Sequence, residues 1–326
     1  MTSLSTIRWL VLSLVPTLGF AAENYAVPRT EWGLPDLQGV WNFSSNTPMQ
    51  RPVQFGNRQY LTDEEVAELE ASLAARDDAA DAAIPFAGVD ESYNDFWVES
   101  AGLGEARLTS HVIYPEDGRL PPLQPDARVA DYSRPPARPV RSTLGILFAS
   151  DGPEDRSLSD RCLIGFNAGP PVTPSFYNNN LQIVQNKDHV VIMTEMVHDA
   201  RIVPLDNRPH APAEIGFWTG DSRGYWEGDT LVVESRNFNG LTNSFSNSGS
   251  SENKRLIEKF TRVAHDRIDY QFTVDDPSTF TDKIVGLIPI YKVAGQIFEY
   301  ACHEGNYGIV NILRGARVEE QLNRDN

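Results

Sequence analysis

Short apolar segments with alternating polar positions recur through the second half of the chain. Turn residues separate these segments, which follow one another at about ten-residue intervals: 181–185, 190–194, 230–234, 259–263, 268–274, 284–291, 296–302 and 307–313. This spacing, without helices in between, is typical of antiparallel sheets that close into a barrel or pack as a sandwich. The pattern predicts a mainly β fold, which a strand at residues 39–43 helps to complete.

One helix is predicted ahead of this region, at residues 62–83. Thr62 and Glu65 have the spacing of a capping box, in which each side chain bonds the backbone N–H of the other residue. A narrow apolar stripe follows, formed by Val66, Leu69 and Leu73, and the pattern stops at Pro85. These features predict a surface helix with one side packed on the protein.

A proline-rich segment follows the helix. Residues 115–139 contain seven prolines and no clear periodicity, and Tyr93, Phe96 and Trp97 lie just before them. Such a composition predicts an extended segment that packs on the body of the protein. We therefore expect an insertion or lid at about residues 50–160 and the main strands at about 160–320. Together they form one mainly β domain, residues 23–326, of a size that suits a single large core.

The N-terminus has the order of charge, apolar core and small residues that is typical of a secretory signal peptide. Arg8 is the only charged residue before Glu23, residues 9–20 are largely apolar, and Ala21 and Ala22 suit a cleavage site. The apolar core is short for a membrane span. We expect cleavage of residues 1–22 and a periplasmic or secreted protein, with an uncleaved N-terminal anchor as the alternative.

The net charge limits which binding partners we expect, and the cysteine content indicates the cellular compartment. The net charge of −17 disfavours nucleic acids and anionic membranes, which are polyanions. Cys162 and Cys302 are the two cysteines, and in an oxidising compartment an even pair predicts one disulfide. Closing so long a loop would stabilise the fold by roughly 4–5 kcal/mol. Nothing in the composition indicates an oligomeric state.

Two resemblances add to this picture. The segment Gly39, Val40 and Trp41 resembles the Gly-x-Trp signature in the first strand of lipocalins and related calycin barrels. The resemblance implies that the Trp closes one end of a barrel beneath an Arg, here Arg314 or Arg317. Nearly all of the mature chain also resembles a broad group of uncharacterised secreted bacterial proteins, a likeness that implies no activity. It is carried by residues 33–43, 161–171, 177–180, 195–205, 220–234, 272–280 and 300–307.

Ionisable residues interrupt an apolar segment at residues 195–201. In an extended strand His198 faces one side, whereas Glu195, Asp199 and Arg201 face the other and can form a ladder of charges. An ion-paired barrel face and a general acid–base site both fit this pattern. Because the segment is apolar on both sides, we expect the His198 ring to be at least half buried.

A second polar segment, residues 300–304, places His303 beside Cys302. A disulfide to Cys162 would bring His303 near Arg161. The candidate catalytic residues are then His198, as the leading base or acid, with Asp199, Glu195, His303 and Tyr177. No close His or Cys spacing and no nucleotide-binding fingerprint is present, so we expect neither a metal nor an organic cofactor.

Polar clusters at residues 177–180 and 221–223 are expected in loops at strand entrances. Asn and Asp commonly cap turns through their side chains. Alternatively, the clusters line the rim of a pocket and bind a ligand, with aromatic residues as apolar walls. The candidate ligand-binding residues are Asn178, Asn180, Asp221, Arg223 and Trp226.

Two functions remain open at this point. One is an exported enzyme that performs acid–base chemistry on a small apolar or aromatic molecule, as an isomerase, lyase or hydratase. The other is a non-catalytic carrier of a small hydrophobic ligand. The density of ionisable groups near the expected strand ends favours the enzyme, because a carrier needs fewer of them.

The N-terminal pattern predicts that the exported protein begins near Glu23. N-terminal sequencing of protein purified from the periplasm or medium measures this directly. A mature protein that still begins at Met1 would contradict a cleaved signal peptide.

Overall fold

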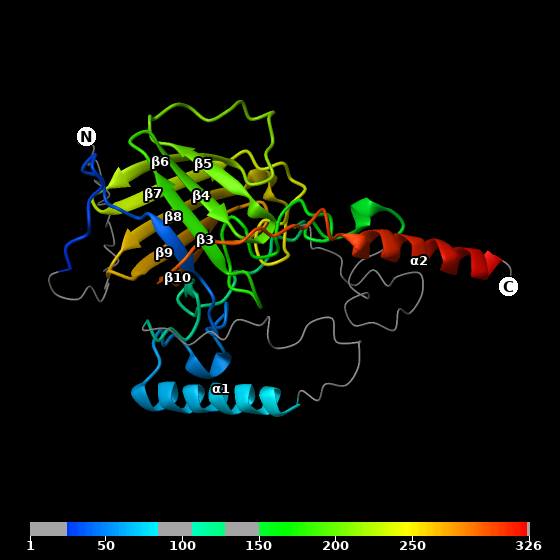
Figure 1. Ribbon diagram of the computed structural model, residues 1–326, viewed down its shortest axis with the longest axis horizontal. Coiled ribbons are helices and arrows are strands. Elements are labelled where there is room, and N and C mark those ends of the chain that lie inside the picture. Colours follow the sequence, from blue (N-terminus) through cyan, green and yellow to red (C-terminus); the bar gives the residue numbers. More distant parts are fainter. Residues whose placement is uncertain (1–24, 84–105, 128–149, 325–326) are drawn as a thin grey trace, which may run out of the picture.

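The computed structural model describes residues 25–83, 106–127 and 150–324, so the predicted signal peptide lies outside the described residues. Antiparallel strands form a nearly closed barrel, which confirms the predicted mainly β fold (Figure 1). The strands are β1 (Gly39–Asn42), β2 (Val112–Tyr114), β3 (Asn180–Gln185), β4 (His189–Thr194), β5 (Ala200–Pro204), β6 (Asp221–Glu227), β7 (Thr230–Arg236), β8 (Arg255–Arg262), β9 (Arg267–Asp275) and β10 (Ile284–Val293). Two helices accompany them, α1 (Asp63–Ala83) and α2 (Tyr307–Arg324).

The strand order is β5-β4-β3-β1-β10-β9-β8-β7-β6, and β2 adds to β10. The N-terminal strand β1 takes part in this sheet, as predicted, and lies between β3 and β10. Val40 lies opposite Gln182 of β3 on one side and opposite Val293 of β10 on the other. A strand far from β3 and β10 in the sequence thus supplies the hydrogen bonds that connect them.

The barrel has a seam between its two outermost strands, β5 and β6. No ladder of hydrogen bonds joins these strands in the described part of the chain. They nevertheless pack closely. A Cβ atom added to Gly224 of β6 would lie 2.7 Å from Cγ1 of Val203 and 2.9 Å from Cδ2 of Leu205. The absence of a side chain at Gly224 therefore lets the two strands approach each other. Residues 205–220 form the loop that leads from β5 to β6 across this seam.

Side chains fill the interior of the barrel. Inward positions alternate along the strands, and on β8 and β9 every second residue is buried. The largest buried apolar side chains include Trp41, Phe43, Phe260, Tyr270 and Phe272. The interior is therefore a packed core, in keeping with a barrel of about this size.

Trp41 is fully buried in the barrel and lies beneath a cation. The guanidinium carbon of Arg262 lies 5.6 Å from the centre of the Trp41 ring, and the indole N–H donates to the Leu37 carbonyl at 2.9 Å. Arg262, at the end of β8, also donates to the Asp36 carbonyl at 2.8 Å. The assignment of this role to Arg314 or Arg317 is wrong, because both belong to α2.

A buried salt bridge connects two strands through the core. Arg201 of β5 donates two hydrogen bonds to Glu258 of β8, one of them at 2.9 Å, and the hydroxyl of Tyr270 on β9 donates to the same carboxylate at 2.7 Å. Burial raises the pKa of Tyr270 well above its usual value, so the hydroxyl keeps its hydrogen. Burial opposes the charge on Arg201, but the adjacent Glu258 outweighs it and raises the Arg201 pKa. The charges are thus paired and hydrogen-bonded, as a buried ion pair requires.

Two predicted strands are wrong. Residues 296–302 contain no strand, because β10 already pairs with β9 on one side and with β1 and β2 on the other. Residues 307–313 are helical and belong to α2, which extends away from the barrel (Figure 1). Its less exposed positions, Ile309, Leu313 and Ala316, have the spacing of a helix, and Asn306 caps it by accepting from the N–H of Ile309 at 3.3 Å.

The predictions for the helix at residues 62–83 and for the proline-rich segment are confirmed in part. Thr62 and Glu65 form the predicted capping box at the start of α1, with backbone bonds of 2.8 and 3.3 Å. Val66 is buried with Leu61, whereas Leu69 is exposed. The described part of the proline-rich segment packs on the core through Leu120 and Leu123. Its remainder, residues 128–139, lies outside the described residues, as do Pro85, Tyr93, Phe96 and Trp97.

Cys162 and Cys302 form the predicted disulfide, with their Cα atoms 5.7 Å apart. A structural disulfide of this kind points to an oxidising, extracellular compartment. Among the described residues, neither helix combines the length and apolar character that a membrane span needs.

We expect a large loss of stability when the carboxylate of the buried Arg201–Glu258 pair is neutralised. Glu258→Gln should lower the free energy of unfolding by about 3–5 kcal/mol, because the buried Arg201 charge loses the carboxylate that it binds directly. Urea denaturation measures the loss. The control is Glu227→Gln, which removes an exposed pair with Lys259 and should cost less than about 1 kcal/mol. Equal losses in both variants would contradict a stabilising role for the buried pair.

Candidate functional site

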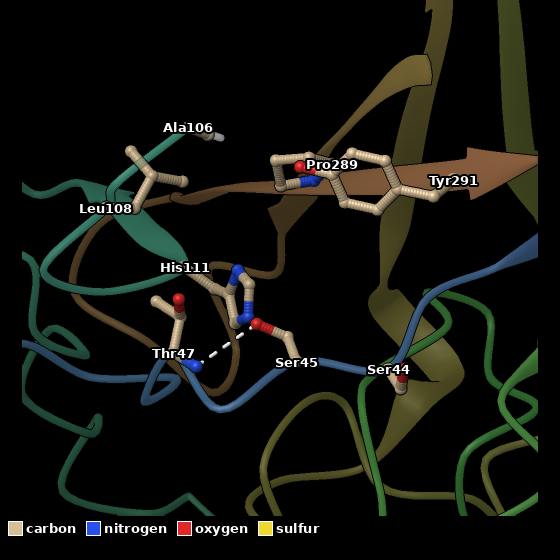
Figure 2. Close-up of a pocket in the computed structure, with 8 residues that line it drawn as sticks. All are labelled: Ser44, Ser45, Thr47, Ala106, Leu108, His111, Pro289 and Tyr291. Carbon is tan, nitrogen blue, oxygen red and sulfur yellow. Dashed lines mark hydrogen bonds between the residues drawn. The ribbon is translucent and has the colours of Figure 1, made fainter. Parts of the chain in front are cut away.

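A small pocket lies between the residues just before β2, strand β10 and the segment that follows β1 (Figure 2). His111 and four hydroxyl-bearing side chains contribute to it. The residues that line the pocket are Ser44, Ser45, Thr47, Ala106, Leu108, His111, Pro289 and Tyr291. None of the candidate catalytic or ligand-binding residues lies in this pocket, so we describe their positions separately.

The expected strand at residues 195–201 is wrong at its centre. Residues Met196–His198 form a 3-10 turn, and β5 begins only at Ala200. Val197 and His198 both have positive φ angles, of 62° and 43°, which a strand does not allow. The turn reverses the chain between β4 and β5, so the assignment of side chains to alternating faces does not hold.

Glu195 and His198 both hold the segment that precedes the disulfide. Glu195, only 4% exposed, accepts hydrogen bonds from the Asn180 amide at 2.7 Å and from the Phe298 N–H at 3.1 Å. Nδ1 of His198 donates to the Tyr300 carbonyl at 3.2 Å. The His198 ring is exposed, which corrects the expectation of a half-buried ring.

The expected charge ladder of Glu195, Asp199 and Arg201 does not form. Arg201 points into the barrel toward Glu258, whereas Glu195 binds residues on the other side of the turn. Asp199 is partly buried, and this burial raises its pKa above the usual value despite the nearby Arg201. The three side chains therefore serve different parts of the structure.

Residues 177–180 are held by an amide network. The side-chain NH2 of Asn167 donates to the carbonyls of Tyr177 and Asn178, both at 3.1 Å. Asn180 joins Glu195 to Asn42 through its own amide group. The bonds from Asn167 hold the loop at residues 177 and 178, whereas Asn180 is the first residue of strand β3.

His303 lies near Arg161, as the disulfide implied. Both side chains line an open depression beside the start of α2. The other residues around it are Pro153, Leu163, Asn306 and Ile309. The structure therefore brings together Glu195, His198 and the segment before His303, whereas the Tyr177 carbonyl binds Asn167.

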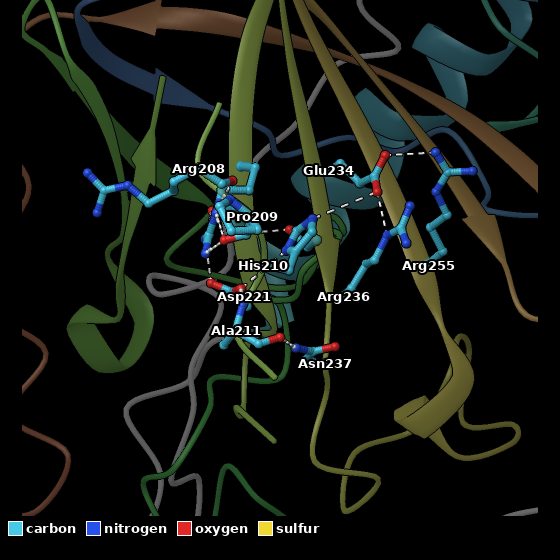
Figure 3. Close-up of polar contacts among 12 residues, drawn as sticks. Arg208, Pro209, His210, Ala211, Asp221, Glu234, Arg236, Asn237 and Arg255 are labelled. Atoms are coloured by element: carbon cyan, nitrogen blue, oxygen red, sulfur yellow. Dashed lines mark hydrogen bonds and ion pairs between the residues drawn. The ribbon is translucent and has the colours of Figure 1, made fainter. Parts of the chain in front are cut away.

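Asp221 and Arg223 lie in strand β6, not in a loop as expected. Asp221 contacts His210, a residue that sequence analysis missed (Figure 3). Asp221 accepts hydrogen bonds from Nδ1 of His210 at 3.2 Å and from the N–H of Ala211 at 2.7 Å. Arg223 binds Asp221 and donates to the Pro209 carbonyl at 2.8 Å. These contacts fix the loop between β5 and β6 on the outer face of the barrel.

The second nitrogen of His210 faces another carboxylate. Nε2 lies 3.8 Å from Oε1 of Glu234 on the neighbouring strand β7. Arg236 binds the same carboxylate, and Arg255 donates to it at 2.7 Å (Figure 3). We call His210, Asp221 and Glu234 the carboxylate–histidine cluster. It is reachable from solvent, since about a fifth of the His210 side chain is exposed.

Both carboxylates of the cluster stay ionised at neutral pH. Partial burial raises the pKa of Asp221, but hydrogen bonds from Ala211 and Arg223 outweigh it and the pKa is lowered. Partial burial likewise raises the pKa of Glu234, and the bonds from Arg255 and Arg236 bring it below the usual value. Because Asp221 accepts the Nδ1 hydrogen, Nε2 is the nitrogen of His210 that can exchange a proton.

Exposed apolar side chains accompany the cluster. Ile215 and Phe217 lie on the same loop as His210, and Tyr225 lies on the outer face of β6. Trp226, a candidate ligand-binding residue, packs instead against the barrel core. No pattern in the sequence marked His210, because a histidine between two prolines in a loop carries no periodicity.

The cluster does not have the geometry of a metal site. The two nitrogens of His210 point at different carboxylates, so the three side chains do not converge on one point. More generally, no three His, Cys, Asp or Glu side chains of the described residues are placed to share a metal ion. In comparisons with known proteins, neither a family model nor a curated protein matches this sequence.

The lowered pKa values predict how the cluster responds to acid. A carboxylate whose pKa is lower in the folded than in the unfolded protein stabilises the fold above its unfolded value, about 4, and loses this contribution as the pH falls through the folded value. The free energy of unfolding should therefore fall more steeply below pH 4 in the wild type than in Glu234→Gln. Urea denaturation at a series of pH values measures both slopes. Parallel slopes would contradict the lowered pKa of Glu234.

Proposed function

We propose that the protein is an exported enzyme that performs acid–base chemistry on a small molecule at the carboxylate–histidine cluster. The observation that carries this proposal is the position of His210 between two carboxylates, with Nδ1 fixed by Asp221 and Nε2 facing Glu234. A carboxylate that orients an imidazole in this way recurs in enzymes that use His as a base and then as an acid.

The roles follow from the hydrogen bonds. Asp221 holds the imidazole in one tautomer and stabilises the imidazolium that forms when Nε2 takes a proton from the substrate. Glu234 lies close enough to Nε2 to stabilise the same cation. Isomerisation, elimination and hydration each require one proton to be removed and one to be returned, and His210 can do both. This chemistry requires no organic cofactor.

The surroundings of the cluster support an apolar or aromatic substrate. Ile215 and Phe217, on the same loop as His210, and Tyr225, on β6, offer exposed apolar surface. Aromatic side chains commonly bind rings by stacking, in addition to burying apolar area. The net charge of −17 supports a small molecule as partner over nucleic acid or an anionic membrane.

We place the enzyme in the periplasm or outside the cell, after removal of residues 1–22. The disulfide between Cys162 and Cys302 supports export, since such bonds persist in oxidising compartments. The alternative function, a carrier of a hydrophobic ligand, draws no support from the described residues, because apolar side chains occupy the barrel interior.

Exchange of substrate hydrogen with solvent tests the proposal without knowledge of the substrate. The purified mature protein is incubated in D2O with a small-molecule extract of the producing cells, and mass spectrometry detects compounds that gain deuterium or change mass by one water. We expect the wild type to label at least one compound. His210→Gln should slow this labelling roughly 10²–10⁴-fold with the fold intact.

The control variants are His198→Gln and His265→Gln, which replace exposed histidines outside the cluster. Both should label at the wild-type rate. A folded His210→Gln variant with full activity, or a wild type that labels nothing, would overturn the proposal. Loss of activity in His198→Gln with the fold intact would return the role to the residue that sequence analysis favoured.

A further inference from the structure

An open depression with a volume of about 420 Å³ lies where the start of α2 meets residues 153–163. A depression of this size has room for a small organic molecule. Pro153, Leu163 and Ile309 give it apolar walls, whereas Arg161 and His303 are basic. Among the described residues that line it, none has a carboxylate side chain. The depression is therefore suited to a negatively charged molecule with an apolar part.

The disulfide brings the two basic side chains together. Arg161 and His303 are the neighbours of Cys162 and Cys302, whose Cα atoms are 5.7 Å apart. Since consecutive Cα atoms are about 3.8 Å apart, the Cα atoms of Arg161 and His303 are separated by at most about 13 Å. Both side chains reach the same depression, and the covalent bond between their neighbours keeps them there.

Two further contacts hold α2 against the opposite wall. The side-chain NH2 of Asn306 donates to the Asp160 carbonyl at 2.7 Å. Further along the helix, Arg317 donates to the carbonyls of Asp151 at 2.6 Å and Ser150 at 3.0 Å. Beyond these contacts α2 extends away from the barrel (Figure 1). The depression is thus already formed without a ligand, which reduces the entropy lost on binding.

The guanidinium of Arg161 is available to a ligand. It forms no ion pair and donates no side-chain hydrogen bond within the described part of the chain. The preceding carboxylate, Asp160, instead pairs with Arg156 at 3.0 Å. A guanidinium is a planar group whose N–H donors match the two oxygens of a carboxylate. Arg161 can therefore bind a carboxylate through two parallel hydrogen bonds.

We propose that this depression binds a small organic carboxylate with an apolar or aromatic carbon skeleton. Arg161 binds the carboxylate, and Leu163 and Ile309 contact the carbon atoms. His303 supplies a further N–H donor from its ring. The single permanent charge of Arg161 matches a monoanion, whereas a phosphate monoester carries nearly two negative charges and would leave one of them without a counter-charge.

This site is separate from the proposed function. None of its residues belongs to the carboxylate–histidine cluster, which lies on β6, β7 and the loop before them. The proposed chemistry depends on His210, whereas binding in the depression depends on Arg161. Each proposal can therefore fail while the other holds.

Isothermal titration calorimetry of the full mature protein tests the proposal, with benzoate as the probe. Benzamide keeps the ring but removes the charge, acetate keeps the charge but removes the ring, and phenyl phosphate adds a second charge. Arg161→Gln removes the guanidinium, and Arg161→Lys keeps the charge without the planar group. The control is Arg314→Gln, which removes an exposed arginine of α2 outside the depression. Thermal melting identifies the variants that are folded.

We expect benzoate to bind at one saturable site, and the other three probes to bind at least about tenfold more weakly. Arg161→Gln should weaken benzoate binding about 10- to 100-fold, and Arg161→Lys by less, because the charge remains. Arg314→Gln should bind like the wild type.

Three results would overturn the proposal. The first is no saturable binding of benzoate to the wild type. The second is an equal effect of Arg161→Gln and Arg314→Gln, which would show a general attraction to positive charge only. The third is phenyl phosphate binding as tightly as benzoate or more tightly, which would exclude a site built for a carboxylate. If Arg161→Gln does not fold, the comparison of Arg161→Lys with Arg314→Gln decides the second point.

Discussion

The fold depends on a salt bridge inside the barrel between Arg201 and Glu258. β5 and β6 lack a ladder of backbone hydrogen bonds to each other, so the sheet alone does not close there. Arg201 of β5 instead reaches across the core to Glu258 of β8, where Tyr270 satisfies the same carboxylate. Such a group resists separation because each charge would otherwise be buried alone. It thereby holds β5 against the rest of the barrel.

The closed seam positions the loop on which the proposed function rests. Residues 205–220 connect the end of β5 to the start of β6. The two strands must therefore stay together if the loop is to keep one conformation. Asp221 and Arg223 then fix its inner part from β6, and His210 is placed beside Glu234 of β7. The interior of the barrel is a packed core, and the polar groups suited to chemistry lie on its outer face. The buried ion pair holds β5 in place beside β6, and these two strands in turn position the loop that carries His210.

Much of the fold could be predicted from local patterns, and the errors have physical causes. Alternating apolar residues marked β3, β4 and β7 to β10, because one face of each strand meets the core. Residues 307–313 were misassigned because a short apolar run suits a strand or a helix equally, and only the residues after it continue with helical spacing. The turn Met196–His198 was missed because a positive φ at Val197 is a conformation that local propensity disfavours. The candidate site was harder still: Asp221 and Arg223 were identified, but nothing in the local pattern showed that His210, on the loop before β6, binds Asp221.

A double-mutant cycle on the buried pair tests this account most directly. Arg201→Met and Glu258→Met are measured singly and together by urea denaturation. The account predicts that each single change is costly and that the second change restores much of the loss, with a coupling of about 3 kcal/mol or more, because the double variant removes the charge that each single variant leaves without its hydrogen-bonded partner. Losses that simply add, within about 0.5 kcal/mol, would contradict a barrel held closed by this interaction.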